Sequence, residues 1–113
     1  MMRDSLNSNS MHYSVLLTAN GNALANQWRA CTNCYSGHNA SPSVADRSLW
    51  LRIVKTGTVI QSFFKRVGNE EWVQFGTTQN INFASAEFYV GIAVTSHDNS
   101  RTGVLKGSDF TIV

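Results

Sequence analysis

The sequence predicts an all-β domain of antiparallel strands. Apolar and polar residues alternate with a period of two through most of the chain, and no segment carries the apolar stripe of an amphipathic helix. Eight glycines accompany a single proline, a composition that fits strands joined by tight turns. The length of 113 residues suits one domain, which we expect to span residues 1–113 as a sandwich or barrel.

The first half of the chain predicts three strands, at residues 1–6, 12–19 and 23–30. The last two flank Asn20-Gly21, a strong hairpin signal because both positions of such a turn adopt positive φ. Residues 31–47 follow as one long loop, rich in Ser, Asn and Gly and holding the only proline. Loops of this length without structure of their own are usually functional or disordered.

The second half predicts a denser set of strands, at residues 48–56, 58–67, 70–78, 87–97 and 106–113. Gly57 and Gly68-Asn69 supply the turns between the first three of them. The run 87–97 is almost continuously apolar, as expected of a central strand buried on both faces. A helix over 58–67 is the alternative, although Phe63 and Phe64 would then straddle its apolar stripe.

The scattered charges argue against a nucleic-acid partner, and the lack of a long apolar stretch argues against a membrane partner. Nine basic residues against seven acidic ones give a net charge of +2, and the basic residues are scattered along the chain. Only Lys65 and Arg66 are adjacent, and neighbours on a strand point to opposite faces. A nucleic-acid site needs basic residues gathered on one face. No stretch approaches the ~20 apolar residues of a membrane helix, and the polar first residues lack the apolar core of a signal peptide.

Four segments together resemble a known family: MMRDSL (1–6), SLWLRIVKTGTVIQSFF (48–64), EEWVQFG (70–76) and YVGIAVTSHDNS (89–100). In this order they resemble domains of the concanavalin A-like lectin/glucanase superfamily, close to the family named for a regulator of enolase. The resemblance implies an antiparallel two-sheet jelly-roll sandwich, usually appended to glycoside hydrolases or adhesive proteins. It also implies an extracellular or cell-surface location, a glycan or polysaccharide partner, and other domains in the same polypeptide.

Two features depart from that family. In its members several strands precede the segment like MMRDSL, so we expect this chain to be the C-terminal portion of such a domain. The second departure is Cys31 and Cys34, which stand where the relatives carry a Gly/Ser-rich loop.

The acidic residues do not predict a catalytic centre. A retaining glycosidase needs two carboxyl groups about 5–5.5 Å apart, which a strand supplies locally by acids at positions i and i+2. None of the seven acids is two residues from another, and the adjacent Glu70 and Glu71 should point to opposite faces. No serine sits in a nucleophile elbow, and no glycine-rich stretch matches a phosphate loop. We therefore predict no enzyme, with a carboxylate pair across strands as the alternative.

The two cysteines allow three interpretations. Cys31 and Cys34 are close enough in sequence to form a small disulfide loop, which is the leading expectation for an exported protein. Free thiols are the second. With His38 the cysteines also have the local spacing of three zinc ligands, and Asp46, His12 or His97 would then have to supply a fourth. A second ligand pair is absent, so we predict neither a metal nor a cofactor.

Sugar sites combine an aromatic ring for the apolar face of the sugar with polar groups for its hydroxyls. Three clusters could supply this combination: Trp28 and Arg29 with Tyr35 in the long loop, Trp50 with Arg52 on one strand face, and His97, Asp98 and Asn99 in a polar loop. Each has a structural alternative, because large aromatics often fill sandwich cores and the last cluster is good turn chemistry.

The resemblance, together with the lack of paired acids, implies a non-catalytic, lectin-like carbohydrate-binding module of a larger exported protein. The alternative is a structural or protein-interaction sandwich that binds no glycan. A remnant of a glucanase is the third interpretation.

Overall fold

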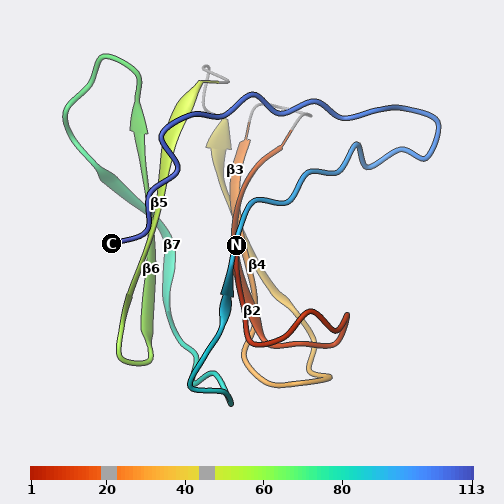
Figure 1. Cartoon of the computed structure of the whole chain (residues 1–113). Helices are drawn as coiled ribbons and strands as arrows, with labels where there is room; N and C mark the ends of the chain where they lie inside the picture. The colour runs from red at the N-terminus through yellow and green to blue at the C-terminus, as the bar shows by residue number, and fades with distance from the viewer. Residues whose placement is uncertain (19–22, 44–47) are drawn as a thin grey trace.

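The computed structural model describes residues 1–18, 23–43 and 48–113 and contains two antiparallel β-sheets. Figure 1 shows the sheets side by side, with β5–β7 on the left and β2–β4 on the right. The strands in chain order are β1 (Met2–Arg3), β2 (His12–Leu17), β3 (Ala23–Arg29), β4 (Gly37–Ser43), β5 (Leu49–Thr56), β6 (Val59–Arg66), β7 (Val73–Asn80) and β8 (Tyr89–Val90). The predicted all-β class is confirmed. None of the described residues forms a helix that is long and apolar enough to cross a membrane.

The larger sheet has the strand order β4-β3-β2-β1-β8. β2 and β3 form its longest regular ladder, which runs from the pair His12↔Arg29 to the pair Leu17↔Leu24. The predicted turn at Asn20-Gly21 lies outside the described residues. β8 is the edge strand of this sheet and forms two residue pairs with β1. The first and the last strand in chain order are therefore neighbours in the sheet.

The smaller sheet, β5-β6-β7, consists of two hairpins. Gly57 and Gly68 adopt φ angles of 60° and 81° at the two turns, a region that glycine occupies without steric cost. Both turns agree with the prediction. The helical alternative for 58–67 is wrong, because β6 pairs with a strand on each side.

The two sheets pack against each other through two clusters of buried side chains. In one cluster Tyr13 of β2 and Ile60 of β6, both fully buried, meet between the sheets; Met11, Ile81 and Phe83 complete it. In the other, Leu24 of β3 packs with Phe64 and Phe75, whose rings meet edge to face. Burial of apolar surface between the layers is therefore what holds the two sheets together.

A buried polar network crosses the same interface. The Tyr13 hydroxyl donates to Ser62 Oγ at 3.0 Å, and Ser62 Oγ donates to the carbonyl of Phe75 at 2.8 Å. Asn26 Nδ2 donates to the Tyr13 hydroxyl at 2.9 Å and to Ser62 Oγ at 3.2 Å. The network thereby joins β2 and β3 of one sheet to β6 and β7 of the other.

The prediction of one long loop over 31–47 is wrong, because β4 occupies Gly37–Ser43. β4 pairs with β3 through pairs that include Trp28↔Gly37 and Ala25↔Ala40. The segment GHNASPS has few residues with β-propensity, so its extended conformation comes from the ladder with β3 rather than from its own sequence.

The prediction of a buried central strand over 87–97 is also wrong. Only Tyr89–Val90 forms a ladder, and it has a neighbour on one side alone. Tyr89, Ile92 and Val94 are 55%, 60% and 53% exposed, so this segment is not core. In Figure 1 the chain beyond β8 extends to the right, turns back and crosses the top of the molecule without forming a strand, which overturns the strand predicted at 106–113.

At the N-terminus the strand predicted over 1–6 is limited to Met2–Arg3. The side chain of Arg3 donates to the carbonyls of Ser5 and Asn7, which lie in the bend that follows β1. The strand ends because these contacts turn the chain out of the sheet.

Candidate ligand-binding face

The outward face of the smaller sheet carries a cluster of aromatic and cationic side chains. Its orientation follows from β6, in which Ile60, Ser62 and Phe64 are buried between the sheets. Successive side chains of a strand alternate between faces, so the intervening residues, Gln61, Phe63 and Lys65, lie on the outward face. Register then assigns their neighbours on β5, because Trp50 pairs with Lys65 and Arg52 pairs with Phe63.

Four side chains on this outward face contact one another, and we call them the tryptophan face: Trp50, Arg52, Lys65 and Trp72. The Arg52 guanidinium lies 4.0 Å from the centroid of the Trp72 ring. The Lys65 ammonium lies 5.5 Å from the Trp50 centroid and 5.2 Å from that of Trp72. These are cation–π distances. Lys65 therefore stands between the two indoles, and Arg52 reaches over β6 to the second.

Polar amides continue the same face beside the tryptophans. Phe63 pairs with Gln74 of β7, and Gln61 Nε2 donates to Gln74 Oε1 at 3.4 Å. An amide offers both donors and acceptors to a ligand. The outward face thus presents rings, cations and amides on three adjacent strands.

The sequence placed Trp50 and Arg52 on one strand face, and the structure brings them together there. The sequence did not indicate that Lys65 and Trp72 belong to the same face. The signal for them was the turn at Gly68-Asn69: the hairpin pairs Phe64 with Val73, which puts Trp72 opposite Lys65.

The predicted cluster of Trp28, Arg29 and Tyr35 is divided by the structure. Trp28 packs partly buried against the core, and its ring lies so close to Gly37 that a Cβ there would be 2.3 Å from a ring atom. Arg29 Nε donates to the carbonyl of Cys34 at 2.9 Å, and its Nη1 donates to the carbonyl of Ser8 at 2.8 Å. These two residues connect parts of the fold.

Tyr35, the third member, is fully exposed, so of these three residues it is the one whose side chain is open to a ligand.

Cys31 and Cys34 are joined by a disulfide in a short turn, where Cys34 N donates to the carbonyl of Cys31. Their sulfurs are therefore not available as metal ligands. His38, the third member of the zinc pattern, interacts through Nδ1 with Gln27 Nε2 at 3.1 Å. Asp46 lies outside the described residues. Among the residues that the structure describes, no group of three or more His, Cys, Asp or Glu side chains could hold a metal ion.

The loop with His97, Asp98 and Asn99 is a turn stabilised by its own side chains. Asp98 Oδ1 accepts hydrogen bonds from the backbone N and the hydroxyl of Ser100, at 2.9 and 2.7 Å. These bonds lower the pKa of the Asp98 carboxyl. Asp98 Oδ2 also lies 3.3 Å from Arg101 Nε. The Asp98 oxygens are thus engaged within the turn, which favours the structural interpretation of this cluster.

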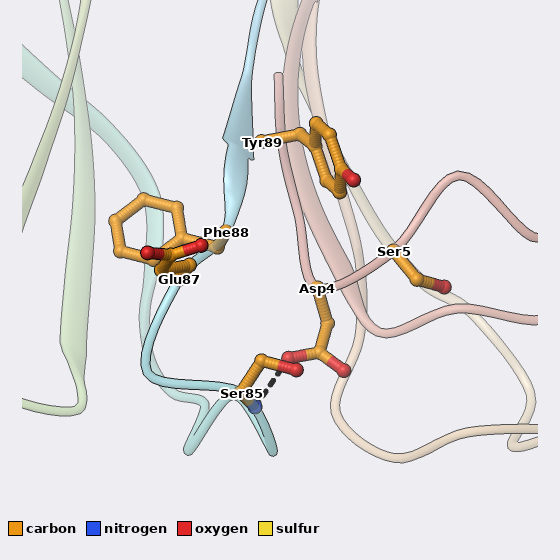
Figure 2. A pocket seen from close by; sticks show the side chains of 6 residues that line it. All are labelled: Asp4, Ser5, Ser85, Glu87, Phe88 and Tyr89. Carbon is orange, nitrogen blue, oxygen red and sulfur yellow. Dashed lines mark hydrogen bonds between the residues drawn. The ribbon is translucent and has the colours of Figure 1, made fainter.

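A hollow of about 420 Å³ lies where β8 meets β1. Figure 2 shows its lining, which consists of Asp4, Ser5, Ser85, Glu87, Phe88 and Tyr89. Asp4 Oδ1 accepts a hydrogen bond from Ser85 N at 2.9 Å, so this carboxylate holds two segments together. The Asp4 and Glu87 side chains do not point toward one another in Figure 2.

Comparisons with protein-family models, with curated proteins and with solved structures found no match to this chain.

Proposed function

We propose that the protein is a non-catalytic, lectin-like carbohydrate-binding module of the concanavalin-like jelly-roll type, exported as part of a larger polypeptide. Its glycan would lie on the tryptophan face. The observation that carries this proposal is the pair Trp50 and Trp72 on one solvent-facing sheet surface, with polar side chains between and beside them.

The chemistry of such a surface suits a sugar. An indole ring stacks against the apolar C–H face of a pyranose, while Lys, Arg and Gln side chains bond its hydroxyls. The residues stand on paired strands of a sheet, so little conformational freedom is lost when a ligand binds. Trp50 is 38% exposed and therefore open to contact from solvent.

The test is glycan-array binding of the soluble protein, followed by calorimetric titration of the best glycan with Trp50→Ala. Loss of one aromatic stacking contact, worth about 1.5 kcal/mol, should weaken binding at least tenfold. Tyr35→Ala is the matched control, because Tyr35 is a fully exposed aromatic residue outside the face. Equal binding by both variants would mean that the glycan does not bind at the tryptophan face. The absence of binding to every glycan would overturn the proposal.

A second candidate function is a structural or protein-interaction domain. The observation that favours it is the number of exposed apolar side chains after β8, which include Ile92, Val94, Val104, Leu105, Phe110 and Ile112. Large exposed apolar side chains that form a patch are typical of interaction sites. Sedimentation velocity distinguishes the two: defined oligomers without glycan binding favour this candidate, and a monomer that binds glycan contradicts it.

A further inference from the structure

We infer that the tryptophan face selects an anionic polysaccharide, one whose sugar rings carry carboxylate or sulfate groups. The inference rests on the proposed glycan function and specifies the ligand class of the same face. It follows from the charge of the face and from the way in which its two cations are held.

Arg52 and Lys65 bring two positive charges to adjacent strands of one surface. Neither forms an ion pair with an acidic residue in the described part of the chain, whereas Arg101 does so with Asp98. Within the described residues, the two charges of the face are therefore not neutralised by an ion pair. A bound anion would compensate it and would gain charge-assisted hydrogen bonds, which are roughly twice as strong as neutral ones.

The two tryptophans position these cations without neutralising them. With its guanidinium 4.0 Å from the Trp72 centroid, Arg52 is in van der Waals contact with that ring. A guanidinium stacked in this way keeps its in-plane N–H donors free for a carboxylate or sulfate oxygen. Lys65 contributes a compact charge between the rings, at 5.5 Å from the Trp50 centroid. Positioning reduces the entropy lost when the anion binds.

The arrangement also gives the residues different roles in binding. Arg52 already occupies one face of the Trp72 indole, whereas the nearest cation to Trp50 is farther away. Trp50 is thus the better stacking surface for a sugar ring, and the anionic group of that ring or its neighbour would lie toward Arg52 and Lys65. A neutral glycan would use the stacking surface and leave both charges unpaired.

The experiment compares polygalacturonate, its fully methyl-esterified form, dextran sulfate and neutral dextran by calorimetric titration at low and high salt. We expect the free acid to bind at least tenfold tighter than its ester, and added salt to reduce this difference by screening exposed charges. The carboxylated and sulfated polymers distinguish the two sources of negative charge.

The variant Arg52→Gln/Lys65→Gln keeps polar side chains but removes both charges, and should abolish the preference for acid over ester while retaining binding to the ester. Lys106→Gln, on the exposed chain far beyond β8 in sequence, removes a positive charge outside the face and is the control; it should bind as the parent does. Thermal unfolding verifies that each variant is folded. Trp50→Ala should lose affinity for acid and ester alike.

Three results would overturn the inference. Equal affinity for acid and ester contradicts the anionic selectivity but leaves the carbohydrate-binding function standing. Equal losses in the Lys106→Gln control and the double variant would reduce the effect to general charge attraction. Tighter binding of single-stranded oligothymidylate than of any polysaccharide would assign the face to nucleic acid, since bases also stack on aromatic side chains beside cations.

Discussion

β6 and the segment from Tyr89 to Val94 both carry several large apolar residues, but they lie in opposite environments. Every second residue of β6 is buried, as Ile60, Ser62 and Phe64 demonstrate, while Tyr89 and its successors are largely exposed. β6 has a strand on each side and the other sheet against its inner face. β8 has only β1 as a neighbour. Burial therefore follows from the layers that surround a strand and not from its own hydrophobicity.

The largest expected effect contrasts the same substitution in the two segments. Ile60→Ala should lower the free energy of unfolding by about 2–5 kcal/mol, because it removes buried methyl groups and leaves a cavity. Ile92→Ala should change it by less than about 0.5 kcal/mol, since Ile92 is 60% exposed. Denaturant unfolding measures both. A comparable loss for Ile92→Ala would mean that the segment after β8 is buried in solution.

A smaller effect concerns pH and again separates the two packed sheets from the exposed chain after β8. Burial of His12, together with the positive charges of Arg3 and Arg29, lowers the pKa of its imidazole from 6.5 to about 4. The unfolded chain takes up this proton first, so stability is lost as the pH falls from about 6.5 toward 4, by up to about 3 kcal/mol. Urea titrations between pH 7 and 4 measure the loss.

His12→Asn should flatten this pH dependence, whereas His97→Asn should leave it unchanged. His97 is exposed and has a φ of 58°, a conformation that asparagine tolerates well. An NMR titration reports the same event directly, and an imidazole midpoint near 6.5 for His12 would refute the burial argument.

The smallest expected effect compares two tyrosines. Tyr13→Phe removes the hydroxyl that accepts from Asn26 and donates to Ser62, and should cost about 1–3 kcal/mol because buried polar groups lose a partner. Tyr89→Phe, in half-exposed β8, should alter stability little. Chemical unfolding of the two variants is the measurement. Similar values for both would contradict the buried network.

Local sequence signals sufficed for part of the fold. Alternation identified β6, and glycine marked the turns at Gly57 and Gly68 because those positions need positive φ. β4 escaped prediction because its extended conformation depends on pairing with β3, which no local pattern reports. The run after Phe88 misled for the converse reason, since its apolar residues lack the second neighbouring strand that burial requires.

The candidate site was predictable to the same extent. Trp50 and Arg52 are two residues apart on one strand, so alternation alone places them together. Lys65 and Trp72 join them only through the register of two hairpins. The positions of the Trp28 and Arg29 side chains depend on contacts with Gly37 and with loop carbonyls, and no periodicity in the sequence predicts these contacts.

The buried hydrogen bonds between Tyr13, Asn26 and Ser62 affect how the protein unfolds. Each sheet supplies partners that the other needs, because β2 and β3 contribute two of these side chains and β6 the third. A molecule in which one sheet had melted would lose these hydrogen bonds and would expose the apolar inner face of the remaining sheet to water. Half-unfolded states are thus disfavoured, and the sheets should separate in a single cooperative step.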